Sequence, residues 1–240
     1  FRDGSTIASK ALPTPGNHEY HTAYAAGYFK YFAELQGLKF VGAYDRSPWY
    51  AKNIGNWRII TVNSNYADER AGSCNIWCQA GVHSTEPAVG GLTARQAYRQ
   101  RSFLAAQLDA AQAEGMGAIV VDHHPALTDG DYAPGTRLGR ILFGVAASHG
   151  AEMFVSGHAH NSQRFTPRNA YGLRSPTGVV QYVVGGGGRV PFDTFTRTGA
   201  AWRDNTHHGA ARIVLHNRSA EVTFEATDGS VLDSSTVPIH

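Results

Sequence analysis

The chain has 240 residues and a mass of 25.9 kDa, which is enough to bury a substantial core within one domain. Hydrophobic residues make up 42% of the chain and charged residues 17%, proportions that exclude a disordered protein. The formal net charge of +2 makes a nucleic-acid partner unexpected. No apolar run approaches the roughly 20 residues that a membrane-spanning helix needs.

The chain opens with FRDGSTIASK, which lacks the charged and apolar regions of a signal peptide. Phe1 is also not typical of a natural start. We therefore expect the sequence to be mature, processed or truncated.

The first predicted element is an aromatic-rich helix from Thr22 to Leu35, which ends at Gly37. A compact apolar run from Trp57 to Val62 then predicts a strand that is covered on both faces. The following segment from Gly72 to Gly91 is predicted to be a long loop, and long loops in compact domains are often functional.

That loop contains the two cysteines of the chain, Cys74 and Cys78, with three residues between them. A thioredoxin-like site has two intervening residues, and a cysteine zinc site needs more ligands. We prefer a local disulfide, which indicates an oxidising compartment and therefore a secreted or periplasmic protein. Two unpaired thiols in a cytosolic protein are the alternative.

From Thr93 onward, the chain contains helices and strands in alternation. Thr93 and Gln96 have the spacing of a capping box at the start of a helix that ends at Gly115. A strand from Ala118 to Val121 follows, and a third helix is predicted from Arg137 to Ser148. The remaining predicted strands are Met153 to Val155, Val179 to Val184, Ala211 to Leu215 and Glu221 to Phe224.

The last two strands leave no room for a helix between them and predict an antiparallel hairpin. Helices that alternate with buried strands, followed by a β-rich tail, predict an α/β fold. We expect a mixed β-sandwich flanked by helices, formed as a single domain over residues 1–240.

Three histidine-bearing motifs lie where a strand or a connection gives way to a turn. They are GNHE at 16–19, DHHP at 122–125 and GHAH at 157–160. The second and third directly follow predicted strands, and loops at the carboxyl ends of strands converge on one edge of an α/β sheet. Imidazole and amide ligands suit zinc, iron and manganese. Each motif alone also fits ordinary polar residues at a strand end, but the three together predict a metal site.

The order of these motifs resembles the last three blocks of the calcineurin-like metallophosphoesterase superfamily. SGHAHNSQRF is similar to the corresponding block of its bacterial and plant purple-acid-phosphatase relatives. The similarity extends to WYAKNIGNWRIITVNSN, to GVVQYVVGGGG and to AARIVLHNRSAEVTFEATDGSVLDS, so it covers nearly all of the chain. It implies the C-terminal part of a metallophosphatase-like α/β/β/α fold from a secreted bacterial hydrolase.

The resemblance also implies a role for each matching residue. The metal ligands would be Asn17, His123 and His158 for one ion and His160 for the other. His18 would lie beside the phosphate and stabilise the transition state or protonate the leaving oxygen. The His-x-Pro spacing favours His123 as the ligand, with His124 as the alternative. The metals would be two ions of iron, zinc or manganese.

The implied reaction is hydrolysis of a small phosphate monoester by a hydroxide that bridges the two metal ions. One alternative is a phosphodiesterase that acts on cyclic nucleotides or nucleic acid, and another is a non-catalytic remnant that binds a partner. Asp122 is either a partner for a ligating imidazole or a solvated turn residue. Gly185 to Gly188 with Arg189 predict a plain turn rather than a phosphate cradle, and His208 is a candidate substrate-binding residue.

Two blocks of the family have no counterpart in this sequence. They are an Asp-x-His block and a Gly-Asp block, which supply the other ligands of the first metal and the bridging aspartate. We therefore expect the domain to be incomplete at its N-terminus, with an N-terminal segment or a companion chain supplying these ligands.

Overall fold

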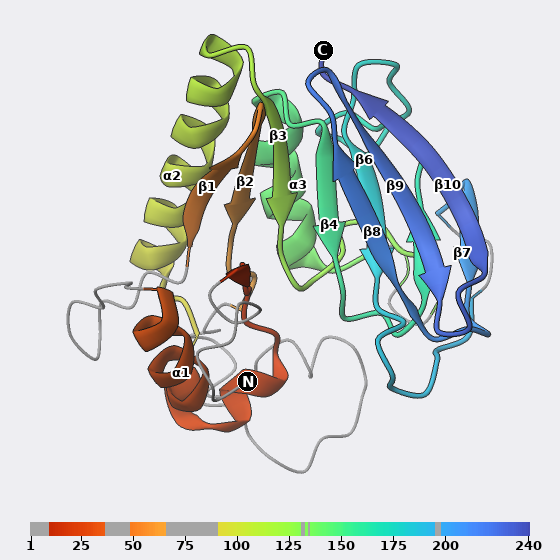
Figure 1. The fold of residues 1–240 in the computed structure, drawn as a ribbon. Coiled ribbons are helices and arrows are strands. Elements are labelled where there is room, and N and C mark those ends of the chain that lie inside the picture. Colours follow the sequence, from red (N-terminus) through yellow and green to blue (C-terminus); the bar gives the residue numbers. More distant parts are fainter. Residues whose placement is uncertain (1–9, 37–48, 66–90, 131–132, 134, 195–197) are drawn as a thin grey trace.

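The computed structural model describes residues 10–36, 49–65, 91–130, 133, 135–194 and 198–240. These residues form three layers: two helices, a large mixed sheet and a small antiparallel sheet (Figure 1). The fold is therefore mixed α/β, as the sequence predicts. No described helix is long and apolar enough to cross a membrane.

The large sheet has seven strands. In spatial order they are β1 (Tyr50–Ile54), β2 (Trp57–Thr61), β3 (Gly117–Val121), β4 (Met153–Ser156), β6 (Val180–Val184), β5 (Ser162–Arg164) and β7 (Trp202–Asp204). Strands β2, β3, β4 and β6 run parallel, whereas β1, β5 and β7 pair antiparallel at the two edges. Strands β2, β3 and β4 correspond to compact apolar runs, as expected of strands that are covered on both faces, and β6 corresponds to the predicted strand at Val179 to Val184.

The small sheet contains β8 (Gly209–Leu215), β9 (Ser219–Ala226) and β10 (Val231–Pro238). The predicted hairpin is confirmed as the β8–β9 pair, in which Leu215 lies opposite Ala220. This sheet packs on the face of the large sheet that lies opposite the helices. Trp57 is fully buried between the sheets, and its Nε1 donates a hydrogen bond to the carbonyl oxygen of His216 at 2.8 Å.

Helix α2 (Ala94–Ala113) begins with the predicted capping box. Thr93 Oγ1 accepts a hydrogen bond from the Gln96 backbone N–H at 3.3 Å, and Gln96 Oε1 accepts one from the Thr93 N–H at 2.9 Å. Helix α3 (Arg137–Ser148) begins in the same way, with Thr136 Oγ1 accepting from the Gly139 N–H at 3.0 Å. The two helices cover the other face of the large sheet, over a core that includes Leu104, Leu142 and Phe154.

The first helix is shorter than predicted. Residues 18–25 form two short 3-10 turns, η2 (His18–His21) and η3 (Ala23–Ala25), and the helix α1 runs from Ala26 to Gln36. Tyr24 and Ala25 have positive φ angles of 58° and 52°, so the chain cannot continue as one helix through this point. Cys74 and Cys78 lie outside the described residues, as does most of the predicted loop that contains them, so their disulfide stays a prediction.

Candidate metal centre

The three histidine-bearing motifs meet at the carboxyl edge of the large sheet. Asn17 directly precedes η2, His123 follows β3 and His158 follows β4. The Oδ1 atom of Asn17 lies 2.7 Å from His123 Nε2 and 3.3 Å from His158 Nδ1. The two ring nitrogens lie 3.2 Å apart. The backbone joins the two turns as well, because the Gly157 N–H donates to the His123 carbonyl oxygen at 3.1 Å.

These three atoms have the spacing of ligands on one metal ion. A circle through them has a radius of about 1.8 Å, slightly shorter than a zinc–nitrogen bond of about 2.0–2.1 Å. A point at bonding distance from all three atoms therefore lies about 1 Å above their plane. The donor set of two imidazoles and one amide oxygen suits zinc, iron or manganese.

Several polar atoms around this point are buried and lack a hydrogen-bond partner among the described residues. They are Asn17 Nδ2, His124 Nε2, His160 Nδ1 and both carboxyl oxygens of Asp122. A buried polar group without a partner typically costs about 1–3 kcal/mol. Such a concentration of unsatisfied nitrogen and oxygen atoms in a small region is typical of a site that takes a ligand.

Burial keeps the clustered imidazoles neutral. It is the main cause that lowers the pKa of His123 to about 3, and the nearby His18 and His160 lower that pKa further. Burial likewise holds the pKa of His124 and of His158 well below the usual value for histidine. A neutral imidazole is the form that binds a metal, so the site is prepared for a cation at neutral pH.

The turn that carries His158 has an uncommon backbone conformation. His158 has a φ of 63°, a region that residues other than glycine rarely occupy. Such strain often accompanies functional sites, and here it turns the ring toward Asn17 and His123. Gly185 allows the turn to pack closely, because a Cβ atom at that position would lie 1.7 Å from the carbonyl oxygen of Ala159.

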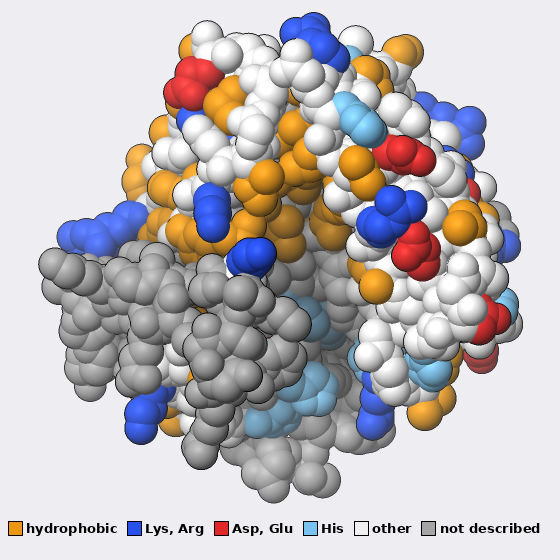
Figure 2. Space-filling model, viewed as in Figure 1, with side chains coloured by type: hydrophobic (Ala, Val, Ile, Leu, Met, Phe, Trp, Pro, Cys, Tyr) orange, Lys and Arg blue, Asp and Glu red, His pale blue; other side chains and the backbone are white. Residues whose placement is uncertain are grey.

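His160 and His18 lie beside the cluster rather than within it. The ring of His160 stacks on Phe192 with centroids 4.1 Å apart, and the Phe192 N–H donates to the His160 carbonyl oxygen at 3.0 Å. His18 is exposed on η2. Partial shielding of each ring by its neighbours is the first cause that lowers the pKa of His18 and of His160, and the charge of Arg189 contributes to each shift. Figure 2 shows histidine side chains, in pale blue, gathered in a hollowed part of this face.

His208 lies near the glycine-rich turn and makes no hydrogen bond to the cluster among the described residues. The following residue, Gly209, donates its N–H to the Gly186 carbonyl oxygen at 3.0 Å. His208 Nδ1 is buried and has no partner in the described part of the chain. Its assignment to substrate binding stays a prediction.

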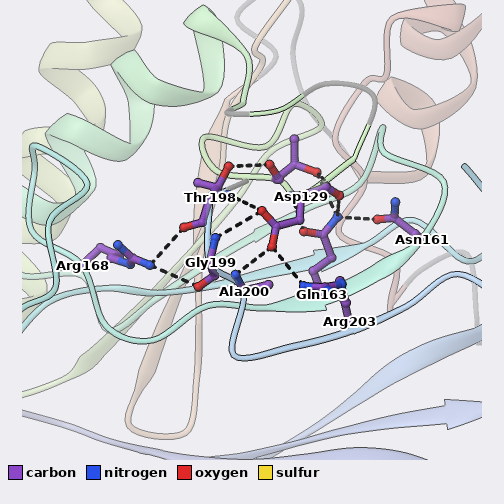
Figure 3. A network of polar contacts seen from close by, with 9 residues as sticks. Asp129, Asn161, Gln163, Arg168, Thr198, Gly199, Ala200 and Arg203 are labelled. Carbon is purple, nitrogen blue, oxygen red and sulfur yellow. Dashed lines mark hydrogen bonds and ion pairs between the residues drawn. The ribbon is translucent and has the colours of Figure 1, made fainter. Parts of the chain in front are cut away.

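Two features of the site were not predicted from the sequence. Ser64, which follows β2, lies 2.7 Å from His124 Nδ1 and contacts a ring that is fully buried. A second polar network joins Asp129, on the loop after β3, to the segment at 198–200 (Figure 3).

The Asp129 network joins the loop after β3 to the segment at 198–200 and, through Gln163, to Asn161, the residue after His160. The buried carboxylate accepts hydrogen bonds from the backbone N–H groups of Thr198, Gly199 and Ala200. Gln163 Nε2 donates to the Asp129 carbonyl oxygen at 2.9 Å and to Asn161 Oδ1 at 2.7 Å (Figure 3). No local sequence pattern indicates this network, because Asp129 and its partners at 198–200 are about 70 residues apart in the sequence.

Comparison with known proteins finds similar folds only among solved structures. A scan of protein families and a search of curated proteins give no match. The purple acid phosphatase PPD1 from seeds of yellow lupin (Lupinus luteus) matches with a TM-score of 0.60 and 16% identity, over 96% of this chain and 39% of that one.

Two further structures match less closely. GAP50, described as the anchor in the inner membrane complex of Plasmodium, gives a TM-score of 0.54 and 14% identity, over 86% of this chain and 62% of that one. PhoD gives a TM-score of 0.50 and 11% identity, over 94% and 48%. The chain spans less than two thirds of each of these proteins. At such identities the likeness concerns the fold alone.

Proposed function

We propose that this chain is part of a metal-dependent phosphoesterase that hydrolyses small phosphate monoesters. The observation that carries the proposal is the triangle of Asn17, His123 and His158, whose three ligand atoms are spaced for one cation. The triangle lies at the carboxyl edge of parallel strands, where α/β sheets bind their ligands. A purple acid phosphatase with a similar fold supports the same reaction class.

Each residue of the site then has a definite task. Asn17, His123 and His158 hold one ion, and His160 offers its buried Nδ1 to a second. When bound, a pair of such ions activates a water molecule for attack on phosphorus and neutralises charge on the phosphoryl oxygens. Because the amide of Asn17 is neutral, it leaves the cation more electrophilic than a carboxylate would.

His18 is the proposed catalytic acid. It is exposed at the start of η2, directly after Asn17, so its ring can reach a bound phosphate while it stays in contact with solvent. Its charge also contributes to the lowered pKa of His158 and of His160, which supports a position near both. Proton transfer by a positioned side chain typically accelerates a reaction by about 10²–10⁴-fold.

The second ion needs further ligands. The only described group of three or more potential metal-binding His, Cys, Asp or Glu residues consists of His123, His124 and His158, so it holds no carboxylate. We propose that carboxylates outside this described group, such as those of a companion chain or segment, supply these further ligands. The similarity to GAP50 shows that an anchor protein can share this fold, so the metal site and not the fold is the feature to test.

The test uses the full-length protein, with metal content and hydrolysis of a chromogenic phosphate monoester and diester measured in parallel. His123→Ala and His158→Ala are expected to lose metal and activity together. His18→Ala is expected to keep its metal and lose about 10²–10⁴-fold in kcat. His216→Ala, on the exposed β8–β9 turn, serves as the matched control.

Two results would contradict the proposal. One is full metal occupancy in His158→Ala, which would show that the triangle is not the site. The other is a metal-loaded wild-type protein without phosphoesterase activity. Faster cleavage of the diester than of the monoester would assign the protein to the alternative phosphodiesterase class.

A further inference from the structure

His124 lies against the metal triangle in a position that simple packing does not explain. Its side chain is fully buried, and its ring centroid lies 4.4 Å from that of His158 and 4.8 Å from that of His123. Its Nε2 atom is buried without a hydrogen-bond partner among the described residues. A packing residue at this position needs no ring nitrogen, and an unsatisfied one is costly.

Ser64 contacts one of the two ring nitrogens of His124, which leaves the other nitrogen to bind a metal ion. The Ser64 Oγ accepts the backbone N–H of His124 at 3.1 Å and lies 2.7 Å from Nδ1. A hydroxyl group has one hydrogen to donate and two lone pairs that accept. If Nδ1 carries the ring proton and donates it to Ser64, both lone pairs are used and Nε2 is left as a bare acceptor.

In this arrangement the Ser64 hydrogen needs an acceptor of its own. Both carboxyl oxygens of Asp122, two residues before His124, are buried and have no hydrogen bond among the described residues. A shift of the two side chains on metal binding would let Ser64 donate to Asp122, which would hold His124 in the tautomer that presents Nε2.

We propose that His124 is a third imidazole ligand of the ion held by Asn17, His123 and His158, with its tautomer fixed by Ser64 and Asp122. This inference rests on the proposed metal site. Metal-ligating histidines usually donate their second ring N–H to a carboxylate, a carbonyl oxygen or water, and here Ser64 takes that part.

The spacing of the ring nitrogens supports the proposal. One ligand atom each from His123, His124 and His158 lies within 4.8 Å of the others. Two ligands of a tetrahedral ion with bonds of about 2.0–2.1 Å are separated by about 3.3 Å. His124 would therefore approach the other two rings by up to about 1.5 Å to share one ion with them. A neutral set of three imidazoles and one amide leaves the full charge on the cation and suits zinc or cobalt.

The experiment titrates the metal-free full-length protein with one equivalent of Co²⁺ and records the visible absorption spectrum and the number of imidazoles from X-ray absorption. We expect three imidazoles in the wild type. His124→Phe keeps the buried ring without its nitrogens, so we expect one imidazole fewer, an altered spectrum and about 10–100-fold weaker affinity. Ser64→Ala is expected to weaken affinity by about 10-fold and to keep the imidazole count.

His216→Phe is the matched control, because it removes an exposed imidazole outside the site and is expected to change none of these values. Unfolding of each metal-free variant is measured to separate loss of a ligand from loss of the fold. The imidazole count of the unmodified protein needs no variant at all.

The outcomes separate the two proposals. Two imidazoles in the wild type, or unchanged Co²⁺ affinity and spectrum in His124→Phe, would overturn the role of His124 and leave the triangle in place. Three imidazoles without phosphate hydrolysis would confirm His124 as a ligand and refute the proposed reaction. A wild type that binds no Co²⁺ would refute both.

Discussion

A buried imidazolium ion lacks the hydration that it has in water, so the buried histidines of the metal-free site resist protonation. The pKa of His123 falls to about 3, and those of His124 and His158 lie well below 6.5, chiefly because of burial. Between these values and 6.5 the unfolded chain binds more protons than the folded chain. The free energy of unfolding therefore falls as pH drops below 6.5, by at most about 1.4 kcal/mol per pH unit for each histidine.

We predict that the metal-free protein is less stable at pH 5 than at pH 7 in urea denaturation. Asp122 and Glu152, whose pKa values burial raises, act in the opposite direction and reduce the slope. His124→Phe is the matched variant and should lose less stability over this range than the wild type. Equal stability of the wild type at both pH values would count against neutral, buried imidazoles.

At the same scale, the proposed ligands were easier to single out than their surroundings. Asn17, His123 and His158 lie in short motifs, two of which follow strands, and such motifs can be read without a structure. Ser64 and Asp129 could not be found this way, because each belongs to a polar pair whose partner is 60 or more residues away. Only tertiary packing brings such pairs together.

Among the elements, the turn after β6 has the tightest tolerance. A Cβ atom on Gly185 would lie 1.7 Å from the carbonyl oxygen of Ala159, between His158 and His160, whereas one on Gly187 would have no atom within 4 Å. We predict that Gly185→Ala lowers the free energy of unfolding by at least about 1–3 kcal/mol and weakens metal binding. Gly187→Ala, two residues away, should change neither. Thermal unfolding and Co²⁺ titration of the two variants check this prediction, and equal effects would contradict it.

Strands and helices with a strong local signal were predicted well. Helix α2 has its capping box at Thr93 and Gln96, and the parallel strands consist of compact apolar runs. Strand β10 was missed because its residues are mainly polar and exposed, so it depends on pairing with β9 rather than on its own pattern. The short edge strand β7 was missed for a similar reason, since only its pairing with β5 defines it.

For the whole molecule, an ion pair joins the two sheets. Arg164 on β5 donates two hydrogen bonds to Asp233 on β10, at 2.6 and 2.8 Å, and both side chains are largely buried. We predict that Asp233→Asn lowers the free energy of unfolding by about 1–3 kcal/mol, because charge-assisted bidentate pairs are strong when they are shielded from water.

The Arg212–Glu225 pair is the matched control. Its contact of 2.6 Å is equally short, but it lies within the small sheet and is exposed to solvent. Glu225→Gln should therefore change stability much less than Asp233→Asn does. Urea denaturation of the two variants provides the measurement. A loss in Glu225→Gln as large as that in Asp233→Asn would show that joining the sheets has no special effect.

The buried carboxylate of Asp129 has a consequence for the motion of the segment at 198–200. Because one side chain accepts from three consecutive amides, we expect Thr198, Gly199 and Ala200 to open together rather than one by one. Hydrogen–deuterium exchange should therefore show one common opening rate for these amides, and Asp129→Asn should speed the exchange of all three. A single buried charge would then set the mobility of a whole surface segment.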